Sequence, residues 1–269
     1  MNQSTGKILS ENNNKIILMI QARIGSNRLP EKVLKSIEGK PMIWHVINRV
    51  KKIPNLQQII LITTQKEEDN ELAKIADEHE ISLFRGDEND VLNRHYECAV
   101  SNKADHIIRI TGDCPLIDPN IVQKILEFYL ENNYDYVSNT INPTFPDGLD
   151  TEIFSFKTLM DSNENAKLPS EREHVTPYIT NHPEKFNIFN FENERDLSFL
   201  RWTVDEELDL QLIKKIYEKM RPDKIFTFDQ VLNLFEQFPE LSHINKGIER
   251  NEGWKQSFDL DKKVKKINS

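Results

Sequence analysis

KIILMIQARIGSNRLPEK, residues 15–32, joins an apolar run directly to a basic loop. Lys15–Ile20 is rich in isoleucine and other apolar residues, which predicts a first, buried β-strand. The loop Gln21–Lys32 that follows contains three cationic residues and a single acid. In open α/β sheets, ligands bind in the crevice beyond the carboxyl ends of the strands. The loop after Ile20 is therefore the first candidate binding site.

Downstream, short β-rich runs alternate with amphipathic segments over the front two-thirds of the chain. In Pro41–Ile53, apolar residues recur on one helical face, and the proline suits the first turn of a helix. Further strands are expected at Gln58–Thr63, Ile81–Phe84, Asp105–Ile110 and Tyr134–Ser138, and further helices at Glu67–His79, Asn89–Ser101 and Asp118–Asn132. This alternation predicts the α/β class, with a mostly parallel sheet and helices on both faces.

The pattern changes after residue 138. Asn139–Leu149 is rich in turn residues, and residues 150–200 are expected to form short strands and a helix near Glu173–Asn181. The remaining expected elements are a strand at Phe199–Val204, helices at Glu206–Met220 and about Asp229–Phe238, and a solvated, lysine-rich end at Lys262–Lys266. We therefore predict a disordered tail at 1–14, one domain at 15–240 with an insertion at about 139–200, and a C-terminal extension at 241–269.

Composition excludes several classes of protein. The 269-residue chain is 38% hydrophobic and carries a formal net charge of −9, which argues against non-specific binding to nucleic acid or to an anionic membrane. The longest apolar run, Ile16–Ile20, is too short to span a bilayer, and the first residues lack a signal-peptide pattern. Cys98 and Cys114 form no C-x-x-C pair and are expected to be packed thiols. We expect a cytoplasmic protein.

The basic loop has the residue types that bind phosphate. Arg23, Arg28 and Lys32 reverse the acidic character of the chain locally, at the expected ligand-binding edge of the sheet. Gly25 lets backbone N–H groups approach an anion, and Ser26 adds a hydroxyl donor. The loop matches neither G-x-x-x-x-G-K-[ST] nor G-x-G-x-x-G, so it is not a Walker loop or a dinucleotide fingerprint. A solvated loop with scattered cations is the alternative.

From Ala22 to Leu34 the sequence reads A-R-x-G-S-x-R-L-P-x-K-V-L, which resembles the signature of the cytidylyltransferases. These include the enzymes that activate Kdo and sialic acids, and the nearest resemblance is to the branch called spore coat polysaccharide biosynthesis protein F. Further matching stretches, in the same order along the chain, are Arg109–Asp118, Phe145–Glu152, Glu171–Tyr178 and Arg201–Asp205. Glu31 departs from the pattern, because the family often carries glycine there.

The resemblance implies a Rossmann-like, glycosyltransferase-A-like fold and transfer of CMP from CTP to a sugar-like acceptor, with release of pyrophosphate. It implies triphosphate contacts from Arg23, Ser26, Arg28 and Lys32. The full set of candidate nucleotide-binding residues is Ala22, Arg23, Gly25, Ser26, Arg28, Lys32, Thr111 and Asp113. The preference for cytosine rests on the resemblance alone, and a homodimer is a plausible assembly.

Two aspartates are candidate Mg²⁺ ligands. Asp113 follows the expected fourth strand, where it would face the same crevice as the basic loop. Asp205 precedes an expected helix, so by itself it reads as an N-cap. The resemblance maps both onto the metal-holding acids of the family, and a triphosphate is seldom handled without Mg²⁺. Together with Arg23 and Lys32, these aspartates form the expected catalytic set.

The insertion at about 139–200 contains the candidate acceptor-binding residues. Asp150 and Glu152 could bind acceptor hydroxyls, and Arg172 and His174 could bind an acidic group. For His174 a structural role is an equal alternative. Arg201 is either a buried ion-pair partner or an acceptor contact, and the sequence leaves both open.

Two other functions compete with nucleotidyl transfer. A metal-dependent glycosyltransferase would use the same fold with a nucleotide-sugar donor, but a triphosphate needs more positive charge, which the basic loop supplies. A non-catalytic nucleotide-binding partner is the second rival, and the presence of Lys32, Asp113 and Asp205 weighs against it.

Overall fold

The computed structural model describes residues 14–26, 28–221, 225–250 and 252–267. Its centre is a seven-stranded sheet with the strand order β5-β4-β1-β6-β8-β7-β9. The strands are β1 (Ile16–Gln21), β4 (Gln58–Thr64), β5 (Ser82–Gly86), β6 (His106–Thr111), β7 (Tyr136–Ser138), β8 (Glu152–Ser155) and β9 (Ile188–Asn190). Strand β8 runs antiparallel to both of its neighbours, and the other pairs are parallel. The prediction of a mostly parallel, mixed sheet is confirmed.

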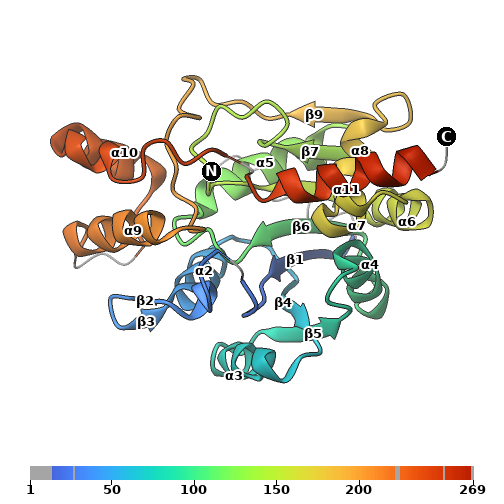
Figure 1. Cartoon of the computed structure of the whole chain (residues 1–269), viewed down its shortest axis with the longest axis horizontal. Coiled ribbons are helices and arrows are strands. Elements are labelled where there is room, and N and C mark those ends of the chain that lie inside the picture. The colour runs from blue at the N-terminus through green and yellow to red at the C-terminus, as the bar shows by residue number, and fades with distance from the viewer. Residues whose placement is uncertain (1–13, 27, 222–224, 251, 268–269) are drawn as a thin grey trace.

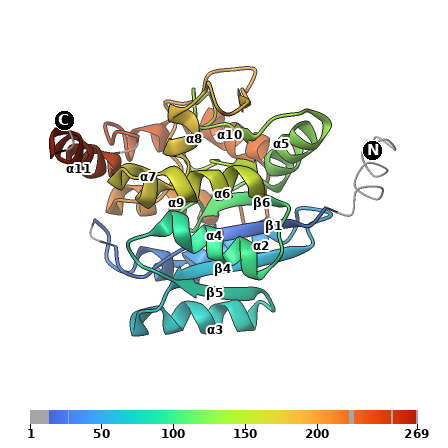
Figure 2. The same ribbon diagram turned by 90° about the vertical axis from the view of Figure 1, so that its right-hand side faces the viewer.

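Helices cover both faces of this sheet (Figure 1). One face packs against α2 (Met42–Val50), α3 (Asn70–Glu78), α5 (Pro119–Glu131), α9 (Glu207–Lys219) and α10 (Phe228–Gln237). The other packs against α4 (Val91–Ser101), α6 (Phe156–Asn165) and α8 (Pro177–Asn181), and α4 and α6 lie in front of the sheet in Figure 2. Alternate residues of β1 enter the two cores, because successive side chains of a strand point to opposite faces.

Short elements complete the fold. They are the two-stranded hairpin β2 (Ser36–Ile37) and β3 (Lys40–Pro41), the 3₁₀ helices η1 (Lys32–Leu34), η2 (Glu67–Asp69) and η3 (Pro239–His243), and the helices α7 (Pro169–His174) and α11 (Trp254–Ile267). Both Cys98 and Cys114 are buried free thiols, as expected. Within the described ranges, no helix combines the length and apolar character that a membrane crossing requires.

The strand expected at Phe199–Val204 does not form. Only an isolated bridge joins Arg201 to Asp147, and the side chain of Phe199 is 76% exposed. The backbone N–H groups of this segment bond to two separate partners: that of Trp202 donates to the Asp147 carbonyl (2.6 Å) and that of Val204 to the Asp113 carbonyl (2.9 Å). Because the partners belong to different loops, no continuous ladder can extend.

The single helix expected at Glu173–Asn181 is also wrong. Two short helices, α7 and α8, replace it, and each begins with a proline at its first turn. Between them Val175 has φ 75°, outside the helical region, so the chain turns there. Pro177 has no backbone N–H to continue a helix from α7, which is the physical reason for the break.

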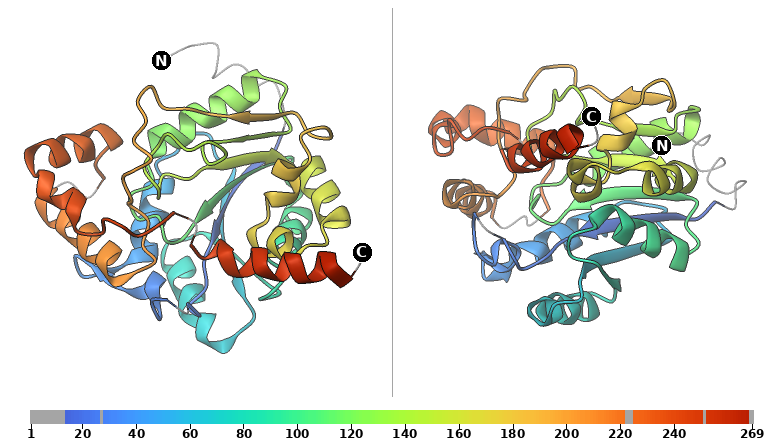
Figure 3. Two further views of the ribbon diagram at one scale, coloured as in Figure 1. Left: turned by 45° about the horizontal axis from the view of Figure 1, so that its top comes forward. Right: turned by 45° about the vertical axis from the view of Figure 1, so that its right-hand side comes forward.

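The C-terminal extension contains a helix rather than a wholly solvated tail. Helix α11 packs against α7, and Figure 3 shows the two side by side. The carboxylate of Asp261 accepts hydrogen bonds from the backbone N–H of Ser170 (3.0 Å) and from its hydroxyl (2.5 Å). The tail expected at 1–14 falls almost wholly outside the described residues.

Candidate active site

A cleft of about 660 Å³ opens at the carboxyl ends of β1 and β6. Gln21 and Thr111, the last residues of these strands, line it. A smaller cavity of about 430 Å³ shares part of this lining and is walled by the basic loop. The expected residues that line at least one of the two are Ala22, Arg23, Gly25, Ser26, Arg28, Lys32, Thr111, Asp113, Asp150, Glu152, His174, Arg201 and Asp205.

The basic loop is held by backbone hydrogen bonds to the neighbouring strand. The N–H of Ala22 donates to the Ile62 carbonyl (3.1 Å), and the N–H of Ile24 donates to the buried carboxylate of Asp69 (2.8 Å). Asp69 also accepts the backbone N–H of Thr64 (3.1 Å), so one carboxylate ties the loop to the end of β4. The cations of the loop are therefore presented from an anchored backbone.

Close packing brings the turn after β6 against this loop. The N–H of Gly112 donates to the Gln21 carbonyl (2.8 Å). A Cβ atom at Gly112 would lie 2.9 Å from the Cβ of Ala22 and 3.2 Å from the Gln21 oxygen, so a larger residue would push the two turns apart. Because Gly112 has no side chain, the next residue, Asp113, reaches the loop cations.

Lys32 lies between the two expected metal-binding aspartates. Its Nζ is 2.7 Å from Asp113 Oδ2 and 2.6 Å from Asp205 Oδ1. Burial acts to lower the pKa of Lys32, but the two carboxylates more than offset it, and the net shift is upward. Burial likewise acts to raise the pKa of Asp113, whereas Lys32 draws it down to about 2. Lys32 and Asp113 are therefore ionised partners at neutral pH.

Asp205 is not a helix cap. The backbone N–H groups of Asp205 and Glu206 both donate to the carboxylate of Asp209, each at 3.0 Å, and Asp209 thereby caps the start of α9. The carboxylate of Asp205 instead accepts Arg28 (2.9 Å) and Arg201 (3.0 Å). Of the two interpretations open from sequence, capping is wrong, and the side chain faces the cleft.

The convergence of two carboxylates fits a hard divalent cation. Oxygens of Asp113 and Asp205 both lie within hydrogen-bond distance of the single Nζ atom of Lys32, so they reach a common point. Across the described ranges, no group of three or more histidine, cysteine or acidic residues is arranged to hold a metal. Mg²⁺ is usually bound by one or two carboxylates together with substrate phosphates, and this pair matches that requirement.

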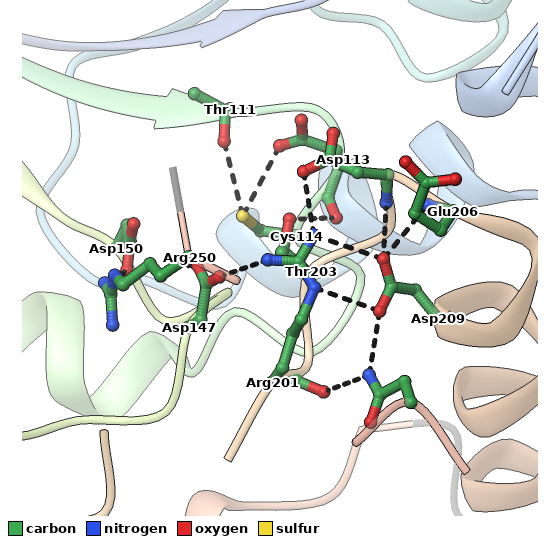
Figure 4. Close-up of polar contacts among 12 residues, drawn as sticks. Thr111, Asp113, Cys114, Asp147, Asp150, Arg201, Thr203, Glu206, Asp209 and Arg250 are labelled. Carbon is green, nitrogen blue, oxygen red and sulfur yellow. Dashed lines mark hydrogen bonds and ion pairs between the residues drawn. The ribbon is translucent and has the colours of Figure 1, made fainter. Parts of the chain in front are cut away.

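Arg201 is an ion-pair centre on the opposite wall of the cleft (Figure 4). Its guanidinium contacts Asp147 (2.7 Å), Asp205 (3.0 Å) and Asp209 (3.0 Å), and only 7% of its side chain is exposed. Next to Asp147, Gly148 has φ 106°, and a Cβ there would lie 2.5 Å from the Thr203 nitrogen, so only glycine fits. Arg201 therefore positions Asp205, as its ion-pair interpretation requires.

Arg250 reaches the cleft from the C-terminal extension, which sequence reasoning missed. Its Nη2 is 2.6 Å from Asp150 Oδ1, and its Nε is 3.9 Å from Asp147 Oδ1. Burial raises the pKa of Asp147 to about 7, with a further contribution from the nearby Asp150, and burial also raises the pKa of Asp150. Asp147 and Asp150 therefore hold a proton more readily than Asp113, whose pKa is lowered.

Glu152 is fully engaged at the floor of the cleft. It pairs with Arg109, which faces it across the β6–β8 register, and it accepts hydrogen bonds from Tyr136 (2.8 Å) and Thr176 (2.5 Å). Arg109 lies in one of the motifs that carry the family resemblance, but its role follows only from this register. Glu152 therefore has few remaining acceptor sites, and the acceptor would meet a network rather than a free carboxylate.

Arg172 and His174, expected side by side in the acceptor pocket, point to different places. Arg172 does not line the cleft: its Nε donates to Asp90 (3.0 Å), because successive residues of a helical turn face different sides. The ring of His174 lines the cleft and stacks on Trp254 at 4.3 Å between centroids, with Nε2 3.0 Å from Ser257 Oγ. Burial lowers the pKa of His174 to about 4, so the imidazole is neutral.

Glu31, the departure from the family pattern, adopts the left-handed backbone region that favours glycine, with φ 55° and ψ 29°. Its exposed side chain lines neither cavity, so it does not oppose a phosphate there. The position thus has a backbone that glycine adopts without strain, whatever its side chain.

Several lining residues carried no functional prediction. They are Gln21, Arg94, Arg109, Tyr136, Thr140, Thr176, Thr180, Thr203, Arg250, Trp254 and Phe258. Gln21, Arg109, Thr176 and Thr203 lie within or beside the matching motifs, which is the signal that could have indicated them. For Arg94, Arg250 and Trp254 no local pattern in the sequence points to the site.

Comparison with known proteins agrees with this geometry. A family model described as cytidylyltransferase matches residues 17–256. The spore coat polysaccharide biosynthesis protein SpsF of Bacillus subtilis is 30% identical over 84% of this chain and 96% of its own length.

Solved structures share the fold. A cytidylyltransferase from Leptospira borgpetersenii superposes with a TM-score of 0.84 at 32% identity, covering 88% of this chain and 100% of that one. The structure of CMP:2-keto-3-deoxy-manno-octonic acid synthetase complexed with CTP superposes with a TM-score of 0.60 at 19% identity, covering 77% of this chain and 99% of that one. The family match spans both walls of the cleft, from the basic loop to Trp254, and the chain belongs to the cytidylyltransferase family of nucleotidyltransferase enzymes.

Proposed function

We propose that this enzyme transfers CMP from CTP to an oxygen of a small sugar or sugar-like acceptor, releasing pyrophosphate, in the synthesis of a cell-surface polysaccharide or related glycan. The observation that carries the proposal is a single cleft lined both by Arg23, Arg28 and Lys32 of one loop and by the distant Asp113 and Asp205. The names of the relatives, a polysaccharide biosynthesis protein and a CMP-sugar-acid synthetase, support this donor and this class of acceptor.

The loop is suited to a triphosphate. Guanidinium groups of Arg23 and Arg28 can contact phosphate oxygens in pairs, and backbone N–H groups near Gly25 and Ser26 add neutral donors. An acceptor oxygen attacks the α-phosphate in line, the bond to the bridging oxygen breaks, and negative charge grows on the leaving pyrophosphate. Cations that are already fixed near that oxygen stabilise the transition state without reorganising.

Asp113 and Asp205 would hold Mg²⁺ in the proposed reaction. When bound, the ion supplies Lewis-acid polarisation of the phosphate and neutralises charge on the leaving group. Lys32 bridges the two carboxylates in the absence of substrate. With the ion held by the carboxylates, the ammonium group of Lys32 would contact a phosphate oxygen instead. Arg201 keeps Asp205 directed at the same point throughout.

The acceptor side is suited to a polyhydroxylated molecule. The three arginines of that wall are paired with acids, Arg109 with Glu152, Arg201 with Asp147 and Arg250 with Asp150. Such pairs present both donors and acceptors, as hydroxyl groups require. Neutral His174 and the ring of Trp254 add an aromatic surface on which a sugar ring could pack.

A two-stage assay tests the proposal. First, the melting temperature is measured with each of the four nucleoside triphosphates in the presence of Mg²⁺, and CTP should give the largest increase. Second, pyrophosphate release is measured with CTP and a panel of sugar acids, neutral sugars and phosphorylated polyols. Release of pyrophosphate with one acceptor class supports the proposal. Release of free nucleotide from a nucleotide-sugar, with no pyrophosphate from CTP, would instead assign a glycosyltransferase.

A further inference from the structure

Arg94 is a buried cation at the edge of the basic loop that the site described above does not use. It belongs to the first turns of α4, and only 1% of its surface is exposed, yet it lines both the cleft and the smaller cavity. We propose that Arg94 binds a terminal phosphate of the nucleoside triphosphate and then of the pyrophosphate product. This inference rests on the proposed function, because it adds a residue to that same substrate site.

The hydrogen bonds of Arg94 are incomplete. Nη1 donates to the Asp87 carbonyl (3.0 Å), whereas Nε is buried and has no partner among the described residues. None of the ion pairs found within 4.0 Å in the described part of the chain involves Arg94. By contrast, Arg109, Arg201 and Arg250 each have a carboxylate partner. Arg94 therefore has unused donor capacity, and no described carboxylate lies within ion-pair distance of it.

Leaving a guanidinium in this state is unfavourable for the folded protein. Burial lowers the pKa of Arg94 to about 10, the neighbouring Arg23 adds to the shift, and the charges of Asp69 and Asp87 offset it only in part. A buried, uncompensated charge destabilises a fold unless a partner supplies the opposite charge. A bound oxyanion would provide that partner, and Arg is well shaped to contact two phosphate oxygens at once.

The local backbone makes room for this side chain. A Cβ atom on Gly86, at the end of β5, would lie 2.9 Å from Cγ of Arg94. Because Gly86 has no side chain, the stem of Arg94 passes over β5 toward the cavity. The position of the guanidinium is thus built by two elements, β5 and α4, and does not depend on a mobile surface loop.

The lining of the smaller cavity favours a nucleotide phosphate over an acceptor group. Arg94 shares that cavity with Arg23, Gly25, Ser26 and Lys32, whereas Asp150, Glu152 and His174 line only the larger cleft. The neutral cytosine ring could accept hydrogen bonds from Arg94, but it could not offset the charge. An anionic phosphate does both.

The test measures pyrophosphate, CTP and cytidine binding by calorimetry with Mg²⁺ present, in the wild type and in R94M, R94K and R221M. R94M should weaken pyrophosphate and CTP binding by about 10-fold to 100-fold, the range for a lost hydrogen-bonded charge, and should leave cytidine binding nearly unchanged. R94K, which keeps the charge but not the forked geometry, should recover part of the affinity. R221M is the matched control, because Arg221 is exposed, pairs with Glu38 and lines neither cavity.

Stability gives an independent reading. Because R94M removes an unpaired buried charge, its ligand-free melting temperature should equal or exceed that of the wild type. A structural arginine would behave oppositely, with a lower melting temperature and unchanged pyrophosphate affinity. G86A, which keeps Arg94 but displaces its stem, should weaken pyrophosphate binding in the same direction.

Unchanged pyrophosphate affinity in folded R94M overturns this inference, as does a loss for cytidine as large as that for CTP. Neither result touches the proposed function, because the wild type would still bind and use CTP. If the wild type binds neither CTP nor pyrophosphate, the proposed function itself fails, and the two failures are thereby separated.

Discussion

The two walls of the cleft are built in opposite ways. The basic loop, residues 21–32, is one contiguous segment anchored by backbone hydrogen bonds to β4 and to the turn after β6. The facing wall is assembled from separate pieces, at 147–152, 173–176 and 201–205, together with Arg250, Gly253, Trp254, Lys255 and Phe258 near the C-terminus. Side-chain ion pairs hold those pieces together, with Arg201 and Arg250 at their centre.

This difference distinguishes Arg23, whose charge is available to a substrate, from the arginines whose ion pairs hold the facing wall together. On the loop wall Arg28 and Lys32 pair with the shared aspartates, whereas the one ion pair of Arg23 among the described residues is a long one, to Glu88 at 3.5 Å, so the charge of Arg23 is available to a substrate. On the facing wall the arginines are already neutralised by carboxylates. We therefore expect substitutions on the loop wall and at the shared aspartates to affect the nucleotide, and substitutions on the facing wall to affect the acceptor.

The largest effect is expected where the walls meet. D113N removes the charge that Lys32 and the proposed metal ion share, so kcat for pyrophosphate release should fall by about a thousand-fold or more. The fold should persist with a lowered melting temperature, because Lys32 loses one carboxylate partner but keeps Asp205 at 2.6 Å. The measurement is steady-state kinetics with circular dichroism on the same samples.

D77N is the matched control for this change, because Asp77 is an exposed residue of α3 and makes the same chemical substitution far from the cleft. A D113N enzyme with near-normal kcat would remove Asp113 from the catalytic site.

A smaller effect should distinguish the walls. R250M leaves Asp150 without its partner at 2.6 Å and should raise KM for the acceptor by about 10-fold to 100-fold. The affinity for CTP alone should stay within about twofold, because Arg250 does not line the cavity of the basic loop. R195M, at an exposed arginine, is the control. Equal losses for acceptor and CTP would contradict the division between the walls.

The smallest effect is expected for the pH dependence of stability, through His174, whose ring stacks on Trp254. Burial lowers the folded-state pKa of His174 from its ordinary value of 6.5 to about 4, so between these values the unfolded chain binds more protons. Its stabilising contribution is therefore present above pH 6.5 and is lost as the pH falls toward 4. The wild type should lose about 1–2 kcal/mol more than H174Q over this interval, measured by urea unfolding. Parallel curves for the two proteins would show that His174 does not titrate in this way.

Much of the fold could be predicted because its signals are local. Ile16–Ile20 is an apolar run and Asp105–Ile110 contains three isoleucines; their apolar residues lie in the parallel neighbours β1 and β6, and the alternation with amphipathic helices predicts the sheet type. The strand at Phe199–Val204 was wrong because its backbone N–H groups bond to carbonyls of two different loops rather than to one neighbouring strand. The break between α7 and α8 was missed, although Pro177 marks it in the sequence.

Site residues that lie close together in the sequence were easier to predict than those brought together by the fold. Arg23, Arg28 and Lys32 stand in one loop at a strand end, where charge and position suffice to indicate phosphate binding. Arg172 was assigned to the acceptor pocket from its sequence neighbours, but its helical position turns it to Asp90. Arg250 and Trp254 lie outside every motif singled out in the sequence, in a segment with no local sign of function. They join the site only through contacts with distant residues, Arg250 with Asp150 and Trp254 with His174.

By itself the sequence determined the mostly parallel core and the position of the basic loop and Asp113 at one edge of the sheet. These follow from apolar periodicity and from the rule that ligands bind at the carboxyl ends of strands, whereas Asp205 was assigned to the same site only through the family resemblance. Only the tertiary structure decided that Lys32 contacts both aspartates, that Arg201 and Arg250 contact carboxylates, and that Arg94 contacts no described carboxylate. Pairing of charges depends on distances between residues far apart in the chain, and burial sets the strength of each pair.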